Sequence, residues 1–373
     1  MKKTVGIITF HASHNYGSML QAYALQQVIL SLGFECEIIN FRTLRQKTFY
    51  KPIWERGNIF GKFKRLLLYA PFHNKLLKKH QLFEEFLQTE FRLSKKEYAT
   101  LQDLEQANLR YDYYISGSDQ IWNTHCFDFD WAYFLPFVEN GERIAYAPSM
   151  GPHPHKVVSE NNATKIKELL SPYKVISVRE KETAERIKHF TGKDYPVMLD
   201  PTLLLTSADW SEIINEQPLI KGKYIFLYTP WFDEATFKTA QSLSQQLGLP
   251  IVVSQLYNGW KRNKWIVYPE FRLYLATGPK EFLNLCKYAT CIIGASFHLV
   301  VFSILLKVPF YTINGMKDSR IANLLSITEL DNRSIDPSKG LETLSLDMDF
   351  KNAIQRIEEA RQKSLNWLKQ NIV

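Results

Sequence analysis

Short apolar runs alternate with helix-like stretches along most of this chain. The runs are rich in β-branched and aromatic residues, as expected of buried strands. Strands that alternate with helices predict mostly parallel sheets flanked by helices. The pattern therefore predicts an α/β fold. The expected strands are 4–10, 34–40, 112–116, 143–147, 174–178, 196–200, 224–229, 250–254, 289–294 and 308–313.

A polar connector near residues 206–222, which contains Pro218 and Gly222, divides the pattern into two series. We therefore expect two α/β units, residues 1–205 and 206–346. The stretch 347–373 repeats apolar residues at helical spacing and is expected to pack back on the first unit. Ligands of open α/β sheets bind beyond the carboxyl ends of the strands, so two facing units predict a cleft. The other expected helices are 17–32, 82–89, 162–170, 180–190, 235–247, 279–287, 298–306 and 319–326.

Composition and spacing exclude several classes of protein. With 45% hydrophobic and 23% charged residues, the chain is typical of a globular protein rather than a disordered one. Its four cysteines match neither a zinc knuckle nor a disulfide framework, which favours a reducing compartment. The apolar stretch 297–306 is too short to span a membrane, and no export signal is evident after Met1. We expect a cytoplasmic protein without structural zinc.

The positive charge of the chain is concentrated in the segment 42–80. It holds eleven Lys and Arg residues against one acid, Glu55, and aromatic residues lie among them. This mixture suits a membrane surface, a lipid-linked phosphate or nucleic acid. The alternative is a solvated basic surface, since a run of charges is often no more than that.

Polar residues follow the strands of the first unit. His14, Asn15 and Gly17 come after the first strand and start a helix, whose N-terminus suits an anion or a substrate hydroxyl. The alternative is an ordinary turn. Residues 116–123 follow the third strand, and there Ser118, Asp119 and Asn123 suit sugar hydroxyls while Trp122 suits an apolar sugar face. The alternative is a capped helix start.

Cations and a histidine occupy the later strand ends. Arg179 follows the fifth strand, and its planar fork matches a carboxylate or phosphate. The alternative is an ion pair with Glu180 or Glu182. In the second unit, His298 lies two residues after Ser296 at a strand end, where an imidazole can act as acid or base, although a lone histidine is usually a packing residue. Lys317 and Arg320 add two cations.

Two further motifs are compatible with metal binding by composition. Asp128-Phe129-Asp130 matches the DxD pattern of metal-dependent sugar transferases, yet it follows no apolar strand, and we interpret it as structural. His153-Pro154-His155 gives no convergent ligand set. We predict no metal.

These motifs in this order resemble the polysaccharide pyruvyl transferase family. The resemblance covers most of the chain, from Asn15-Tyr16-Gly17 through Ser116–Asn123, Ser177-Val178-Arg179 and Asp200–Leu204 to Ser296-Phe297-His298 and Lys317–Arg320. It implies two Rossmann-like domains facing a cleft, similar to B-type glycosyltransferases. It also implies an acceptor side in 1–205 and a donor side in 206–346.

The resemblance implies transfer of a pyruvyl group from phosphoenolpyruvate to two hydroxyls of a sugar in a surface or capsular polysaccharide precursor, as a cyclic ketal. Phosphoenolpyruvate is the donor substrate, and no cofactor is expected. His298, Asp119 and Arg179 would be catalytic. The donor would contact Arg179, Ser296, His298, Lys317 and Arg320, and the acceptor would contact His14, Asn15, Gly17, Ser118, Asp119, Trp122 and Asn123.

The chain departs from the family pattern at two positions. It has Ser296 where members often carry Arg, and Ser18 where they commonly carry Asp. Arg262, Arg272, Lys317 or Arg320 are the candidates to supply the cation that Ser296 replaces.

Two alternatives differ in the class of function. One is a B-type glycosyltransferase with a sugar-nucleotide donor, and the other is a non-catalytic protein that binds an anion or a lipid. The acceptor is expected to be lipid-linked, with segment 42–80 touching the inner face of the plasma membrane. Nucleic acid is not expected, because it would leave the strand-end polar residues unexplained.

Overall fold

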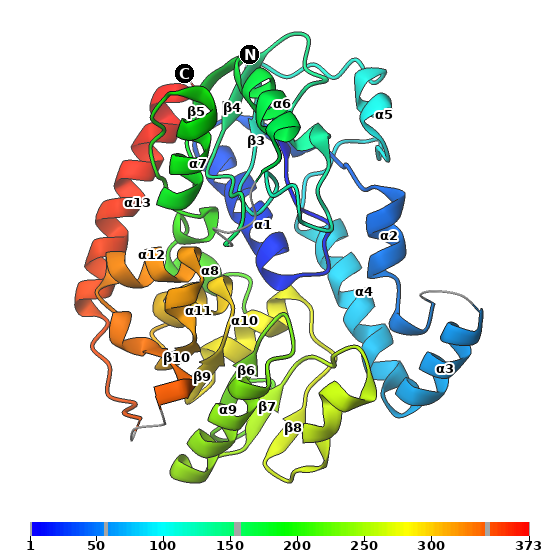
Figure 1. The fold of residues 1–373 in the computed structure, drawn as a ribbon, viewed down its shortest axis with the longest axis vertical. Helices are drawn as coiled ribbons and strands as arrows, with labels where there is room; N and C mark the ends of the chain where they lie inside the picture. The colour runs from blue at the N-terminus through cyan, green and yellow to red at the C-terminus, as the bar shows by residue number, and fades with distance from the viewer. Residues whose placement is uncertain (1, 56–58, 153–157, 340–343, 373) are drawn as a thin grey trace. The chain divides into compact units, whose positions relative to one another are not determined.

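The computed structural model describes residues 2–55, 59–152, 158–339 and 344–372, and Figure 1 shows its ribbon. The chain divides into two compact units between Leu205 and Thr206. Unit 1 comprises Met1–Tyr50, Leu87–Leu205 and Glu358–Val373, and unit 2 comprises Lys51–Phe86 and Thr206–Ile357. Residues 51–86 thus group with the second unit, whereas the order of the sequence predicts segment 42–80 in the first.

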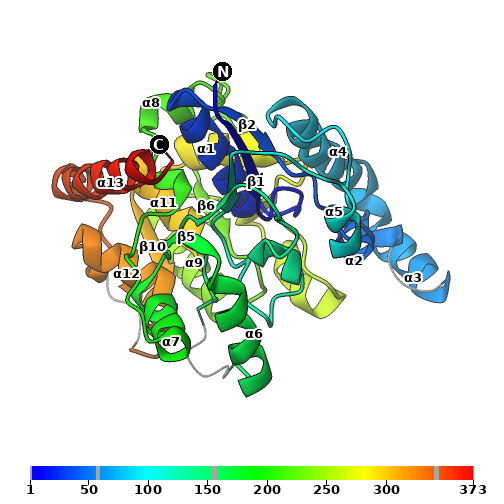
Figure 2. The ribbon, with the colours of Figure 1, turned by 90° about the horizontal axis from the view of Figure 1, so that it is seen from above.

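Unit 1 contains a five-stranded parallel sheet in the order β2-β1-β3-β4-β5. The order runs outward from β1 in both directions, and right-handed crossovers then place helices on both faces. Figure 2 shows α1 and α6 on opposite sides of β1. The elements are β1 (Thr4–Ile8), α1 (Tyr16–Ser31), β2 (Glu35–Ile38), α2 (Leu44–Tyr50), α5 (Leu101–Glu105), β3 (Tyr113–Ser116), β4 (Glu142–Ala145), α6 (Glu160–Leu170), β5 (Tyr173–Ile176) and α7 (Lys181–Thr191).

The strand expected at 196–200 does not form. Val178 and Val197 make only an isolated parallel bridge, with Val178 N–H donating to Pro196 O and Met198 N–H to Val178 O. Proline has no N–H to continue a ladder. Asp200 instead caps a short 3₁₀ helix, Pro201–Leu203, by accepting from Thr202 N–H.

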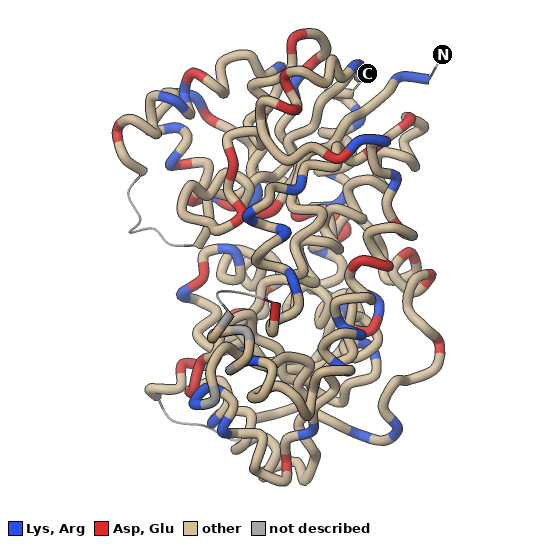
Figure 3. Tube along the Cα trace, turned by 90° about the vertical axis from the view of Figure 1, so that its right-hand side faces the viewer, with Lys and Arg blue, Asp and Glu red and all other residues tan. Residues whose placement is uncertain are grey.

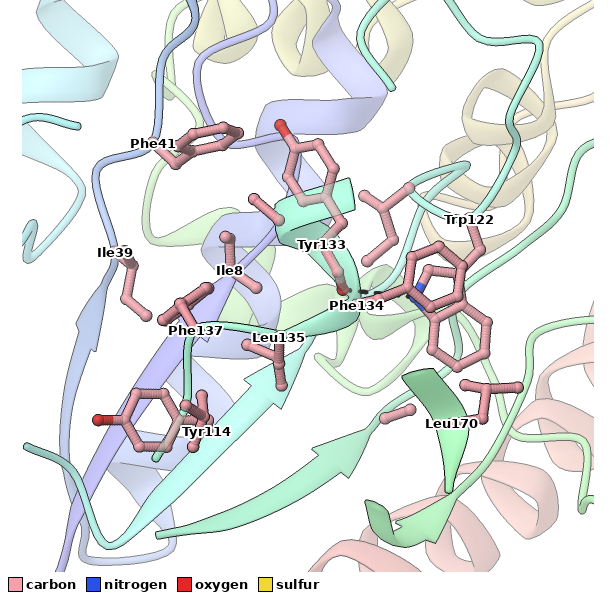
Figure 4. Close-up of a cluster of buried hydrophobic side chains, with 14 of the residues drawn as sticks. Ile8, Ile39, Phe41, Tyr114, Trp122, Tyr133, Phe134, Leu135, Phe137 and Leu170 are labelled. Carbon is pink, nitrogen blue, oxygen red and sulfur yellow. Dashed lines mark hydrogen bonds between the residues drawn. The ribbon is translucent and has the colours of Figure 1, made fainter. Parts of the chain in front are cut away.

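One face of this sheet buries an aromatic core, shown in Figure 4. Trp122 and Phe134 stack with ring centroids 5.0 Å apart, and the Trp122 side chain is fully buried. Tyr133 contributes its backbone oxygen as an acceptor for the Trp122 indole N–H. Burial of side chains of this size is a large apolar contribution to stability. Trp122, Tyr133, Phe134 and Phe137 of this core come from the segment that follows β3.

Unit 2 contains a six-stranded parallel sheet in the order β11-β10-β9-β6-β7-β8. The sequence pattern does not reveal β8 and β11, because these edge strands are short. The elements are α8 (Ser207–Ser211), β6 (Ile225–Tyr228), α9 (Glu234–Leu247), β7 (Ile251–Val253), β8 (Phe271–Leu273), α10 (Pro279–Lys287), β9 (Cys291–Gly294), α11 (Phe297–Leu305), β10 (Phe310–Ile313), α12 (Ser319–Thr328) and β11 (Ser334–Ile335).

Two more helices, α3 (Ile59–Tyr69) and α4 (His73–Thr89), come from the basic segment. The Tyr69 hydroxyl donates to Tyr257 O at 3.1 Å, and Lys79 Nζ donates to Ser254 O at 2.8 Å. These bonds attach the end of α3 and the first half of α4 to loops of the same unit.

The last helix, α13 (Lys351–Asn371), supplies part of each unit. In unit 1, Arg361 Nε donates to Leu203 O at 2.7 Å, and Ser364 Oγ accepts from Leu199 N–H. Among the helices that the structure describes, none has the length and apolarity needed to cross a bilayer.

Candidate functional site

Arg179 lies at the centre of a buried polar cluster that follows the strands of unit 1. Its Nη1 atom is 2.9 Å from Asp200 Oδ2 and 3.7 Å from Asp119 Oδ1. Its Nε donates to Glu180 Oε2 at 3.4 Å. All four side chains are at most 7% exposed. One guanidinium therefore faces three carboxylates in a site largely closed to water, which we call the Arg179 cluster (Asp119, Arg179, Glu180 and Asp200).

Hydroxyl groups from several loops support these carboxylates. Ser18 Oγ donates to Asp119 Oδ2 at 2.6 Å, and Ser149 Oγ donates to Glu180 Oε1 at 2.7 Å. Asp200 Oδ1 accepts from the hydroxyl and the N–H of Thr202. A buried carboxylate needs such donors, because burial removes its water. The loops after β1, β3, β4 and β5 are thus held together through this network.

Asp119 has an unusual backbone. Its φ is 72°, in the left-handed region that residues other than glycine seldom adopt. The Asp119 carbonyl accepts from Ser149 N–H at 2.8 Å, which fixes the turn after β3 to the turn after β4. Strained conformations of this kind are held by their surroundings and recur at functional sites. The geometry aims the Asp119 carboxylate at Ser18 and Arg179.

The surroundings of Arg179 favour the ion-pair alternative over the donor clamp predicted from the sequence. Its guanidinium already meets three protein carboxylates, and Asp200 is the nearest of them. Glu180 is also a partner, whereas Glu182 pairs with Arg186. A substrate phosphate would have to compete with these carboxylates for the guanidinium. These contacts are those of the ion-pair alternative, and the donor contact of Arg179 stays a prediction.

At the predicted anion site of the first helix, a capping side chain already accepts from two N–H groups. Asn15 is the N-cap of α1, and its Oδ1 accepts from Gly17 N–H at 3.0 Å and Ser18 N–H at 3.3 Å. These two N–H groups are therefore used inside the protein. Gly17 is buried, and His14 stacks on Tyr50 with ring centroids 5.4 Å apart. The ordinary turn is the better interpretation here.

Trp122 cannot offer a face to a sugar, contrary to the prediction from the sequence. It is fully buried against Phe134, and its indole N–H donates to Ser116 Oγ at 3.1 Å. Ser118 is equally buried, with its hydroxyl near Ala147 O and Asp200 Oδ2. Asn123 is half-buried and bonds to Gln120 and His125 within its own loop. The dense polar set after β3 is thus mostly internal.

Asp128 is a further candidate site residue, although it does not directly follow a strand. Its Oδ2 accepts from the hydroxyls of Ser13 and Tyr50, while its Oδ1 has no hydrogen-bond partner among the residues that the structure describes. Burial, with a smaller effect from the Asp119 charge, raises the pKa of this carboxyl above its usual range. The DxD pattern marks the residue, but only the fold brings it to Ser13.

His11 follows β1 and is a buried titratable residue of unit 1. It is 1% exposed, with Nδ1 near Thr9 O and Nε2 near Asn40 Oδ1. Burial lowers the pKa of His11 from 6.5 to about 4, although both hydrogen bonds act in the opposite direction. The folded protein therefore keeps this imidazole neutral under conditions in which the unfolded chain takes up a proton.

We expect the stabilising effect of neutral His11 to be complete above pH 6.5 and to be lost as the pH falls toward 4. At pH 5 the loss is about 2 kcal/mol in the free energy of unfolding. Urea denaturation at pH 7 and pH 5 should show a smaller decrease for His11→Gln than for the wild type. Equal decreases in the two proteins would contradict this assignment.

The predicted donor residues of unit 2 lie at the ends of the adjacent strands β9 and β10. Ser296 is the N-cap of α11, and its side chain makes no capping hydrogen bond. His298 stands in the first turn of α11 and is 7% exposed. After β10, Lys317 is exposed, and Arg320 binds Asp318 through Nε–Oδ1 at 2.9 Å and Nη2–Oδ2 at 2.6 Å. Both sets of residues therefore follow the carboxyl ends of neighbouring strands in one sheet.

Two buried polar atoms near Lys317 favour a ligand at the carboxyl ends of β9 and β10. Asn314 Oδ1 and Ser319 Oγ are buried, and within the described ranges neither has a hydrogen-bond partner. Such atoms are costly unless a water or a ligand satisfies them. The sequence does not single them out, since Asn and Ser are ordinary residues of a turn. They extend the candidate donor site beyond the predicted residues.

Residues 2–55, 59–152, 158–339 and 344–372 contain no group of three His, Cys, Asp or Glu side chains arranged to hold a metal ion. The His153-Pro154-His155 motif lies outside the described residues.

Solved structures with the same fold are similar to this chain over nearly its whole length. UDP-N-acetylglucosamine 2-epimerase from Rickettsia bellii has a TM-score of 0.55 and 11% identity, covering 100% of this chain and 97% of the epimerase. The S. aureus MnaA structure with UDP has a TM-score of 0.52 and 11% identity, covering 96% of this chain and 88% of MnaA. These likenesses confirm the predicted α/β fold with two parallel sheets.

Two further comparisons concern the sequence itself. No curated protein matches the chain. The family model described as polysaccharide pyruvyl transferase matches residues 15–315, which include the strands from β2 to β10 and the candidate residues from Asn15 to His298. The chain therefore belongs to the polysaccharide pyruvyl transferase family.

Proposed function

We propose that this protein transfers the pyruvyl group of phosphoenolpyruvate to two hydroxyls of one sugar in a surface or capsular polysaccharide precursor. The observation that carries the proposal is the family match over residues 15–315. The product is a cyclic ketal, and inorganic phosphate is released. We further propose that the reaction takes place in the cytoplasm on a lipid-linked acceptor.

The chemistry needs one proton donor and two acceptors of hydroxyl protons. The methylene carbon of phosphoenolpyruvate takes up a proton, and the first sugar hydroxyl adds to the neighbouring carbon. The C–O bond to phosphate then breaks, and the second hydroxyl adds to the same carbon and closes the ring. Each step is a proton transfer or an ionic substitution, so acid–base side chains and cations are sufficient. We propose phosphoenolpyruvate as substrate and no separate cofactor.

We place the donor at the carboxyl ends of β9 and β10 in unit 2. His298 is the candidate proton donor, because an imidazole can exchange protons near neutral pH. Lys317 supplies an exposed cation, and Arg320 supplies a second one beside it that now binds Asp318. The unsatisfied atoms of Asn314 and Ser319 support a ligand there. Lys317 and Arg320 are the candidates for the charge that Ser296 does not provide.

We place the acceptor at the Asp119 side of unit 1. Ser18 and Arg179 hold the Asp119 carboxylate in one orientation, and a carboxylate held in this way can accept a proton from a sugar hydroxyl. His14 and Asn123 are half-buried and have polar groups that suit further hydroxyls. Asn15 and Trp122 are not included, because capping and packing already use them.

Phosphate release from phosphoenolpyruvate tests the proposal. The purified protein should release phosphate only when a glycan acceptor is present, and the glycan should gain one pyruvate ketal by mass spectrometry. Parallel reactions with UDP-sugars serve as the control. Acceptor-dependent turnover of a UDP-sugar, with phosphoenolpyruvate unchanged, would replace the proposal with glycosyl transfer. Binding of anions without turnover of any donor would favour the non-catalytic alternative.

A further inference from the structure

The helix α3 presents an apolar face to solvent. Phe60 is 88% exposed, Phe63 64%, Leu66 43% and Leu67 62%. Their spacing places them within an arc of about 120° on the helix, given 100° per residue. Large apolar side chains are usually scattered on a protein surface, and a contiguous group indicates a binding surface. We call these four residues the α3 apolar face.

The charge around this face indicates what binds it. Residues 59–80, from α3 and the first part of α4, contain six Lys and Arg residues and no acid; these are Lys62, Lys64, Arg65, Lys75, Lys78 and Lys79. Figure 3 marks the Lys and Arg positions along the chain in blue. An acidic partner surface is needed to match this charge, and an apolar layer is needed to take the Phe and Leu side chains.

An anionic lipid bilayer supplies both features. Amphipathic helices with aromatic and Leu residues on one face and cations beside it lie in the interface of such bilayers. We propose that the α3 apolar face binds the surface of a membrane that contains anionic lipids. Tyr69 and Lys79 then connect the membrane-bound helices to unit 2 through their bonds to Tyr257 O and Ser254 O.

This inference goes beyond the proposed function, because binding to vesicles needs neither donor nor acceptor. Each can therefore fail alone: the phosphate-release assay with a soluble acceptor does not require vesicles, and vesicle binding does not require turnover. If both hold, the α3 apolar face also brings the enzyme to acceptors that are linked to lipid.

Co-sedimentation with vesicles tests the inference. The full-length protein should bind vesicles of phosphatidylcholine with phosphatidylglycerol at least about tenfold more than vesicles of phosphatidylcholine alone, and high salt should weaken binding severalfold. The triple variant Phe60→Ser, Phe63→Ser, Leu67→Ser should lose at least about tenfold in binding. The control Trp231→Ser, which removes a 79% exposed side chain outside the basic segment, should bind like the wild type.

Several results would overturn the inference. The first is equal vesicle binding by the triple variant and the wild type. The second is equal binding of the wild type to vesicles with and without phosphatidylglycerol, and the third is no vesicle binding at all. A wild type that is dimeric by light scattering, with a monomeric triple variant and no vesicle binding, would assign the face to a second copy of the chain. Thermal unfolding checks that the triple variant is folded, which its exposed positions lead us to expect.

Discussion

Arg179→Met should lower the free energy of unfolding by about 3–5 kcal/mol. The variant leaves Asp119, Glu180 and Asp200 buried without their guanidinium, and each of these side chains is at most 7% exposed. Hydroxyl donors such as Ser149 and Thr202 remain, but they do not neutralise charge. Urea denaturation at pH 7, with the free energy extrapolated to water, measures the effect.

Arg356→Met is the matched control for this prediction. Arg356 pairs with one carboxylate, Glu329, at the surface, where the two side chains are 45% and 57% exposed. Its loss should cost less than about 1 kcal/mol. If Arg179→Met is instead as stable as the control and fails to bind phosphoenolpyruvate, Arg179 is the donor clamp that the sequence predicts.

His298→Gln should reduce kcat for phosphate release by about 10²–10⁴-fold, the usual contribution of a general acid or base. Glutamine keeps a polar side chain of similar size at this 7% exposed position, so unfolding should change by no more than about 1 kcal/mol. KM for phosphoenolpyruvate should change much less than kcat, because the imidazole acts on the methylene carbon rather than on the anionic groups.

The exposed His189 in unit 1 provides the control for this variant. His189→Gln should retain the wild-type kcat under the same conditions. A His298→Gln protein that keeps more than about a tenth of kcat would remove the imidazole from the proton transfer. Asn314→Ala and Ser319→Ala would then be the next variants to measure. The side-chain oxygens of Asn314 and Ser319 are buried, lack a hydrogen-bond partner among the described residues and follow the carboxyl end of the adjacent strand β10.

Most of the elements could be predicted because their signals are local. The strands at Thr4–Ile8 and Ile225–Tyr228 are short apolar runs, and helices such as Glu234–Leu247 begin at a capping Asp and end at a glycine with positive φ. Prediction failed where local sequence was ambiguous. The run at 196–200 looks like a strand, yet proline and the capping by Asp200 turn the chain aside.

The candidate site was predicted less well, because the role of a polar residue depends on what the fold brings to it. Trp122 and Arg179 both follow strands, as binding residues do, but one packs in the core and the other is enclosed by carboxylates. Ser18 and Asp119 are 101 residues apart in the chain, and Ser13 and Asp128 are 115 apart. No spacing rule relates such pairs.

The amino-acid sequence by itself determined the α/β class, the two series of strands and the family to which the chain belongs. The periodicity of apolar residues and short motifs each extend over a few residues, so they can be recognised in the sequence without coordinates. Only the tertiary structure decided which polar side chains are internal, which carboxylates share one guanidinium, and that the apolar face of α3 lies in solvent. Burial and ion pairing arise between segments that are distant in the chain, and they exist only once the sheets have formed.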